Sequence, residues 1–96
     1  MLYMILATDA PDAHELRLKA RPKHVARLQA LSEAGRLALA GPTPMPDDAE
    51  QVSGSLIVAE FDSLDEAQLW AETDPYAEAG VYEEVLIKPF KQVFPA

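Results

Sequence analysis

Cysteine is absent from this chain of 96 residues, which also has only four glycines and a single tryptophan. Without a thiol, the chain can form no disulfide framework, no thiolate nucleophile and no zinc ribbon. The sequence also lacks a G-x-S-x-G motif, a P-loop and a dinucleotide fingerprint, so the usual signals of those hydrolases and nucleotide-binding proteins are missing. We expect a fold held by packing alone.

Basic residues are scarce as well, because eight Lys and Arg stand against sixteen Asp and Glu, for a net charge of −8. A field of that sign repels phosphate backbones and anionic lipids, and the few aromatic residues do not form a base-stacking platform. We therefore expect neither a nucleic-acid nor a membrane partner. The two histidines, His14 and His24, lack metal-ligand spacing, so we also expect no metal and no cofactor.

The apolar stretch over residues 1–7 has no basic region before it and meets Asp9 too early to be a secretory signal or a membrane span. This pattern indicates a cytoplasmic protein. The length suits a single domain over residues 1–96. The hydrophobic fraction of 49% is high for so small a chain, which suggests that some apolar surface lies in an oligomer interface.

Apolar runs and capping signals divide the chain into six elements. Strands are predicted over residues 2–8, 37–41, 54–61 and 81–88, and helices over residues 12–34 and 63–73. Both helices begin with the spacing of a capping box, Asp12 with Glu15 and Ser63 with Glu66. Pro22 either kinks the first helix or marks the first turn of a second segment. Gly35 ends that helix, and Gly80 turns the chain into the last strand.

Prolines at 42, 44 and 46 predict an irregular loop over residues 42–53, because proline removes backbone donors. A loop of about a dozen residues is long for a small domain, and such loops often act as lids.

The order strand, helix, strand, strand, helix, strand is that of an α+β, ferredoxin-like βαββαβ fold with a four-stranded antiparallel sheet. Two helices cover one face of such a sheet, yet residues 2–7 and 56–61 are apolar on both faces. A bare apolar face would aggregate, so we predict a homodimer in which two sheets pack together about a two-fold axis.

His24 and Asp74 are the most direct indication of a site. The helical phase places His24 on the side of Ala20, Leu28 and Leu31, against the sheet. A carboxylate beside an imidazole fixes its tautomer and raises its basicity. Taken separately, His24 is as readily a half-buried core residue, and Asp74 before Pro75 an ordinary turn residue.

Several weaker candidates accompany this pair. Arg17, Arg21, Lys23 and Arg27 form a basic stripe that either attracts an anionic substrate or is simply a solvated face. Ser53 and Ser55 flank Gly54 in a pattern typical of a ligand close to the backbone or of a simple turn.

The chain resembles the YciI-like (YCII-related) family over essentially its whole length. The resemblance rests on Tyr3–Asp9, on Arg21-Pro22-Lys23-His24, on Gly35-Arg36-Leu37 with Ala40-Gly41-Pro42, on Gly54-Ser55, on Asp74-Pro75-Tyr76 with Gly80-Val81-Tyr82, and on Ile87-Lys88-Pro89-Phe90. It implies a dimeric α+β barrel and a site centred on a histidine and an aspartate, which correspond to His24 and Asp74.

A relative in that family eliminates chloride from a chlorinated hydroxyhydroquinone, and the barrel resembles those of muconolactone isomerases, so the resemblance implies a small cyclic or phenolic substrate. We expect His24 to act as general base or acid and Asp74 to orient it. Arg21 and Tyr76 would bind a carboxylate or phenolic oxygen, Ser55 and Gly41 would line the pocket, and the 42–53 loop would help close it. The alternatives are a non-catalytic dimeric ligand-binding or accessory module and a cofactor-free oxygenase.

Overall fold

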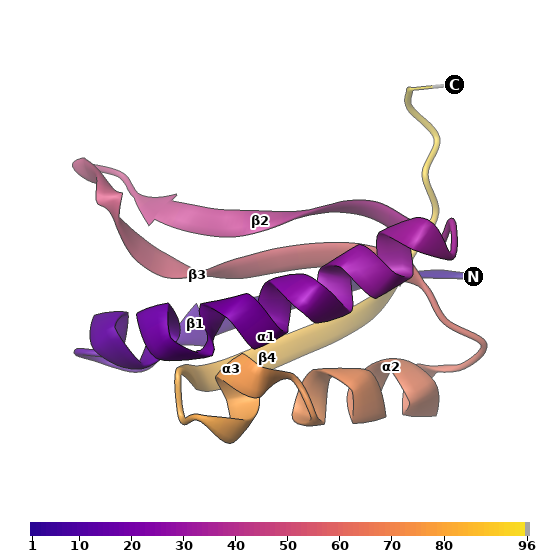
Figure 1. Ribbon diagram of the computed structural model, residues 1–96. Coiled ribbons are helices and arrows are strands. Elements are labelled where there is room, and N and C mark those ends of the chain that lie inside the picture. Colours follow the sequence, from indigo (N-terminus) through magenta and orange to yellow (C-terminus); the bar gives the residue numbers. More distant parts are fainter. Residues whose placement is uncertain (96) are drawn as a thin grey trace.

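The computed structural model describes residues 1–95, which form one antiparallel sheet with helices on one side of it (Figure 1). The elements in chain order are β1 (Leu2–Asp9), α1 (His14–Glu33), β2 (Leu37–Met45), β3 (Asp48–Glu60), α2 (Leu64–Glu72), α3 (Pro75–Glu78) and β4 (Tyr82–Phe90). The strand order is β2-β3-β1-β4. The predicted α+β, ferredoxin-like sheet of four antiparallel strands is confirmed. The short helix α3 was not predicted.

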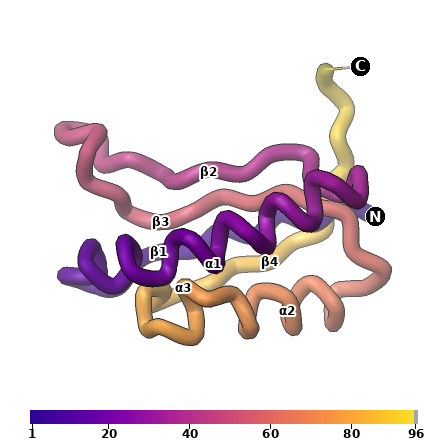
Figure 2. Tube along the Cα trace, in the orientation of Figure 1, coloured from indigo at the N-terminus to yellow at the C-terminus, as the bar shows by residue number. Residues whose placement is uncertain are grey.

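The core lies between the sheet and the two long helices, α1 and α2 (Figure 2). Ile5 of β1 pairs with Ile57 of β3 and with Ile87 of β4, so these three positions share one face of the sheet. Helix α1 contributes Leu31, and α2 contributes Ala67 and Ala71, to the same buried cluster. The helices therefore cover the face formed by one alternating set of strand residues.

Local capping signals were right at three ends and wrong at one. The Ser63 hydroxyl accepts a 3.1 Å hydrogen bond from the Glu66 N–H and begins α2 as predicted. Gly35 and Gly80 have φ of +70° and +81° and end α1 and α3, where a left-handed residue lets the chain leave the helix. Asp12 does not cap α1: it has φ of +59°, and Ala13 is the N-cap, without a side-chain bond. An aspartate tolerates that turn conformation, which takes its carboxylate out of the capping position.

Pro22 neither interrupts α1 nor begins a second segment, because α1 runs from His14 to Glu33 across it. The ring removes the N–H that would bond to the carbonyl of Leu18. Leu18 is 57% exposed, so water can reach this turn of the helix. The opposite side of α1, which carries His24, stays against the sheet.

The predicted loop over residues 42–53 is a β-hairpin, with β2 ending at Met45 and β3 beginning at Asp48 (Figure 1). Pro42 and Pro44 fit into β2 because it is an edge strand, where a missing donor can face away from the sheet. Thr43 and Ser53 hydrogen-bond across the hairpin, with 2.9 Å between their hydroxyl oxygens. The expectation that prolines break regular structure considers only neighbouring residues, so it could not show that this segment lies at a sheet edge.

The face of the sheet opposite the helices keeps large apolar side chains in contact with solvent. Leu6, Leu39, Leu86 and Phe90 are between 37% and 52% exposed, and a hollow of about 410 Å³ is lined by Met4, Leu39, Leu56, Val58 and Phe90 together with the C-terminal segment. This is the face for which the sequence predicts a second copy. Among the described residues, no helix combines the length and the apolar character that crossing a membrane requires.

Candidate active site

His24 and Asp74, fifty residues apart in the chain, are in direct contact. His24 projects from α1, and its Nδ1 lies 2.9 and 3.0 Å from the two carboxylate oxygens of Asp74. The two residues are 6% and 1% exposed. A carboxylate in this position accepts a hydrogen bond from the Nδ1–H group, which keeps that proton on Nδ1 and leaves the lone pair of the imidazole on Nε2. The pair lies under the helices and not on the open face of the sheet.

The local sequence Asp74-Pro75-Tyr76 explains how the carboxylate is held. Asp74 is the N-cap of α3, and its Oδ1 accepts a 2.9 Å hydrogen bond from the Tyr76 N–H. Pro75 occupies the first turn of that helix, where its fixed φ is favourable and its missing N–H costs nothing. The same carboxylate therefore starts a helix and orients an imidazole.

The other ring nitrogen of His24 is free. Nε2 makes no hydrogen bond within residues 1–95, and it is not one of the fully buried polar atoms that lack a partner there. It therefore keeps some contact with solvent. A nitrogen with a lone pair that solvent reaches, backed by a fixed carboxylate, is suited to take a proton from a bound molecule.

Aromatic and cationic groups stack beside the pair. The rings of His24 and Tyr76 are nearly parallel, with centroids 4.0 Å apart. The guanidinium carbon of Arg17 lies 4.5 Å from the centre of the Tyr76 ring. Tyr76 thus connects the histidine to a buried arginine.

Arg17 belongs to the predicted basic stripe, which was expected either to attract an anionic substrate or to be a solvated face, and the structure buries it. Its Nε and Nη2 donate to the two carboxylate oxygens of Asp9 at 2.9 and 3.0 Å, and Nη2 also donates to the Ser55 hydroxyl at 2.8 Å. Burial opposes the charged form, but the hydrogen bond and the charge of Asp9 outweigh it and raise the pKa of Arg17. One feature of the sequence pointed to the burial of Arg17: it precedes His24 by seven residues, which places both on one face of the helix.

We expect Arg17→Met to destabilise the protein strongly, because it leaves the carboxylate of Asp9, 8% exposed, without its partner. Loss of one member of a buried ion pair costs about 3–5 kcal/mol. Urea unfolding measures this, with Arg21→Met on the exposed side of α1 as a control expected within about 0.5 kcal/mol of the original. The double variant Arg17→Met with Asp9→Leu should recover part of the loss. Equal free energies of unfolding for Arg17→Met and Arg21→Met would contradict the buried ion pair.

Tyr82 belongs to the same cluster and was not predicted. Its ring meets that of Tyr76 edge-on, with centroids 5.8 Å apart. Its hydroxyl is buried and has no hydrogen-bond partner within residues 1–95. Burial raises the pKa of Tyr82 well above its usual range, and nearby Ser55 and Arg17 offset only part of that effect.

The raised pKa of Tyr82 predicts how stability depends on pH. Above about pH 10 the unfolded chain loses the phenol proton while the folded chain keeps it, so this group lowers stability as the pH rises. We expect Tyr82→Phe to make the loss of stability above pH 10 less steep in urea unfolding. At pH 7 the free energy of unfolding of Tyr82→Phe should equal or exceed that of the original protein, since an unpaired buried hydroxyl costs about 1–3 kcal/mol. A marked loss at pH 7 would mean that the hydroxyl has a partner.

The remaining predicted site residues are only partly brought together. Ser55 is 3% exposed and reaches the cluster through its bond to Arg17. Arg21 is exposed and makes no hydrogen bond in the described chain, although its charge lowers the pKa of Tyr76, which burial raises overall. Gly41 lies on the edge strand β2, paired with Leu56, which lines the open face. The structure therefore does not bring Gly41 to His24.

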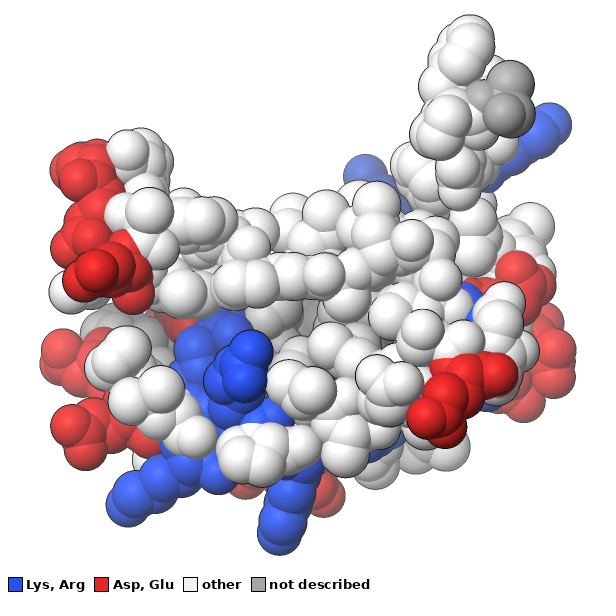
Figure 3. All heavy atoms as spheres, turned by 45° about the horizontal axis from the view of Figure 1, so that its top comes forward, with Lys and Arg blue, Asp and Glu red and all other residues white. Residues whose placement is uncertain are grey.

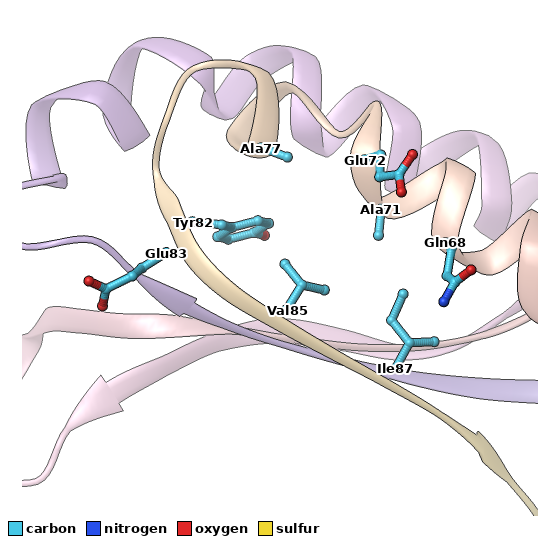
Figure 4. A pocket seen from close by; sticks show the side chains of 8 residues that line it. All are labelled: Gln68, Ala71, Glu72, Ala77, Tyr82, Glu83, Val85 and Ile87. Carbon is cyan, nitrogen blue, oxygen red and sulfur yellow. The ribbon is translucent and has the colours of Figure 1, made fainter.

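Two hollows border the cluster. One, of about 450 Å³, is lined by Arg17, Asp9 and His14 and by Met45 and residues 51–53 of the hairpin, so part of the predicted lid faces it as fixed strands. The other, of about 490 Å³, lies between α2, α3 and β4 (Figure 4). In Figure 4 the side chains of Val85 and Ile87 point from β4 toward α2, and the ring of Tyr82 forms a wall.

Charge is unevenly distributed around these features. Figure 3 shows Lys and Arg side chains gathered over α1, while Asp and Glu lie toward the ends of the molecule. Within residues 1–95, no group of three or more His, Asp and Glu side chains is placed to hold a metal ion.

Comparison with known proteins shows where this arrangement belongs. Protein YciI of Escherichia coli O6:H1 is 54% identical over 98% of this chain and all of that protein, and Protein YciI of Shigella flexneri matches equally. An uncharacterized protein of Haemophilus influenzae is 47% identical over the same shares.

Among solved structures, the 5-chloro-2-hydroxyhydroquinone dehydrochlorinase TftG of Burkholderia phenoliruptrix AC1100, in complex with 2,5-dihydroxybenzoquinone, has a TM-score of 0.84 at 28% identity. The match covers 95% of this chain and 94% of that one. The family model of the YCII-related domain matches residues 1–91. The chain therefore belongs to the YCII-related domain family.

Proposed function

We propose that this protein is a cofactor-free enzyme that moves a proton to and from a small cyclic or phenolic molecule, with His24 as the general base or acid. The observation that carries the proposal is the contact between His24 Nδ1 and both oxygens of Asp74, with Nε2 left free. Asp74 holds the ring and stabilises the imidazolium that forms when Nε2 takes a proton.

In the proposed step, Nε2 accepts a proton from an acidic O–H or C–H group of the substrate. The electron pair left behind moves into the ring system, where it either expels a leaving group or is reprotonated at another carbon by the imidazolium. The first outcome is an elimination and the second an isomerisation. Neither requires an oxidant, because the proton and the electron pair are both accounted for.

The residues around the pair support binding of a polar ring. Tyr76 stacks on His24, and Arg17 lies over Tyr76. One guanidinium and two aromatic rings are therefore already stacked on one another. Tyr76, together with the exposed Arg21, is proposed to bind a phenolic or carboxylate oxygen of the substrate. An acid–base pair supplies about 10²–10⁴-fold, so binding must supply the rest of the rate enhancement.

The similar dehydrochlorinase indicates a substrate class for the first experiment. Loss of HCl from a chlorinated hydroxyhydroquinone needs one proton removed and one chloride released with its bonding pair, which is the elimination described above. We would incubate the protein with 5-chloro-2-hydroxyhydroquinone and with the unchlorinated compound in D₂O. Chloride release and deuterium entering ring positions, each above the rate without protein, are the expected results. Absence of both from these and related phenols would favour the non-catalytic alternative.

One observation favours that alternative, a dimeric ligand-binding or accessory module in which the pair is structural. Asp74 already has a structural task, because it caps α3 through the Tyr76 N–H. A carboxylate that is 1% exposed needs partners wherever it lies, and His24 is one of them. Separate measurements of stability and turnover distinguish the two functions.

We also propose that the protein is a homodimer formed through the open face of the sheet. Leu86 is 47% exposed there, whereas Leu18 is 57% exposed on the outside of α1. Light scattering after gel filtration should give twice the chain mass of 10.5 kDa. Leu86→Lys should shift the protein to the monomer, because it places a charge in the apolar interface. Leu18→Lys should leave the dimer intact, and a monomeric original protein at tens of micromolar would contradict the proposal.

A further inference from the structure

Two arginines meet two aromatic rings where α1, α2 and the start of β2 come together, at a place that neither His24 nor Asp74 lines. The guanidinium carbon of Arg27 lies 4.4 Å from the centre of the Trp70 ring, and that of Arg36 lies 5.4 Å from the centre of the Phe61 ring. The two rings are 5.9 Å apart. A hollow of about 310 Å³ opens beside them and is completed by Leu69, Thr73 and Glu66.

Within residues 1–95 neither arginine has a carboxylate partner, although acidic residues outnumber basic ones sixteen to eight. The ion pairs within residues 1–95 are Arg17 with Asp9 and the N-terminus with Glu60, and the His24–Asp74 contact joins these only when His24 is protonated. Arg27 donates Nη2 to the Thr73 hydroxyl at 3.2 Å. Arg36 donates Nε and Nη2 to the Glu60 carbonyl at 3.2 and 2.9 Å. Both side chains therefore keep unused donors beside one hollow.

One guanidinium nitrogen of Arg27 makes no hydrogen bond within residues 1–95. Its Nη1 is buried and has no acceptor in the described chain, and an unmade bond of that kind costs about 1–3 kcal/mol. Burial also lowers the pKa of Arg27, against the opposing charges of Asp74 and Glu78. Stacking on Trp70 involves the face of the guanidinium and not its edge, so the N–H groups of that edge stay available to an acceptor. An anion in the hollow would then accept from this edge.

We propose that the hollow is a binding site for a small organic carboxylate, whose oxygens bridge Arg27 and Arg36 and whose apolar body lies against Trp70. The planar fork of a guanidinium matches a carboxylate, and two such groups in one hollow can share its two oxygens. Leu69, Phe61 and Trp70 give the hollow an apolar wall. Glu66 lies at the rim and already accepts the Asp62 N–H at 3.2 Å, so a second negative charge on the ligand is disfavoured.

Trp70 provides a direct readout, since it is the single tryptophan in the chain. We would titrate the full-length protein with sodium benzoate and follow both tryptophan fluorescence and heat of binding. Saturable binding of benzoate is expected, with weaker binding of inorganic phosphate and of benzamide, which has the same shape without the charge. Benzamide binding as tightly as benzoate, or phosphate binding more tightly, would overturn the assignment to a carboxylate.

Matched variants locate the site. Arg27→Gln and Arg36→Gln should each raise the Kd for benzoate about tenfold or more, which corresponds to about 1.4 kcal/mol. Glu66→Gln should lower the Kd, and Lys23→Gln, exposed on the same helix as Arg27, should leave it unchanged. For Arg27→Gln the Kd is taken from the heat of binding, because this change also alters the surroundings of Trp70 and hence its fluorescence. Circular dichroism confirms that each variant is folded.

His24→Ala separates this proposal from the proposed function. Benzoate binding should survive in this variant, because no side chain at the hollow is bonded to His24. Loss of binding in His24→Ala together with normal binding in both arginine variants would place benzoate at the His24 pair and overturn the second site. No saturable binding at all would also overturn it, without bearing on whether His24 moves protons.

Discussion

His24→Asn should lower turnover about 10²–10⁴-fold while the protein stays folded. Asparagine keeps an amide N–H that can donate to the buried carboxylate of Asp74, but it has no basic nitrogen to take a proton. The factor is the usual contribution of a positioned acid or base. Steady-state kinetics on any substrate that the original protein turns over, together with thermal unfolding, measure the two effects in the same preparation.

His24→Ala is the companion variant and tests stability more severely. Asp74 is 1% exposed. In His24→Ala its carboxylate keeps the hydrogen bond from the Tyr76 N–H but loses the one from His24. If the pair serves catalysis, water entering beside the free Nε2 position can solvate the carboxylate, and the melting temperature of His24→Ala should stay within a few degrees of His24→Asn. A large fall in melting temperature in both variants with unchanged turnover would show that His24 is structural.

Asp74→Ala should be among the most destabilising single changes in the protein. It removes the cap of α3, worth about 0.5–2 kcal/mol, and leaves His24 Nδ1 and the Tyr76 N–H without their acceptor. The Tyr76 N–H bond is the cap itself, so the lost cap and the unpaired His24 Nδ1 sum to about 1.5–5 kcal/mol. This should lower the melting temperature by about 6 °C or more in a domain of this size. Differential scanning calorimetry measures it.

Asp74→Asn separates the two tasks of the carboxylate. Asparagine is as good an N-cap as aspartate, so most of the stability should remain. Turnover should nevertheless fall about 10²-fold or more, because a neutral amide neither stabilises the imidazolium nor fixes its tautomer as a carboxylate does. Ser63→Ala is the matched control: it removes the cap of α2, so it should cost stability and leave turnover unchanged. Full turnover in Asp74→Asn would rule out an electrostatic role for Asp74.

The elements of the fold were predictable where the signal is local. The apolar run of β1, the glycines at 35 and 80, and the Ser63 cap each act within a few residues, and all occur as predicted. The hairpin between β2 and β3 was missed because a proline is excluded from a sheet interior but tolerated at an edge. Which strand lies at an edge depends on the strand order, which is a property of the whole sheet.

The candidate site divides in the same way. His24 could be placed against the sheet from the helical period alone, and Asp74 was named beside it from its side-chain chemistry and then from the family resemblance. The burial of Arg17 was not predicted, because it was grouped with Arg21, Lys23 and Arg27 in a basic stripe, and an isolated arginine is rarely buried. Burial becomes possible when Asp9 from β1 and Ser55 from β3 supply its acceptors, and neither acceptor is near it in the sequence pattern. Tyr82 was not predicted because its neighbours Tyr76, Ser55 and Arg17 come from other segments of the chain.

By itself, then, the sequence determined the element order, the α+β class, the helix face that carries His24 and the apolar character of both faces of the sheet. These follow from periodicity and capping, whose physical range is one or two turns of chain. Only the tertiary structure decided that Asp74 meets His24 while capping α3, and that Arg17 and the hydroxyl of Tyr82 are buried beside them. A buried charge or hydroxyl is stable or costly according to the partners that distant segments bring to it, and that is decided when the helices pack on the sheet.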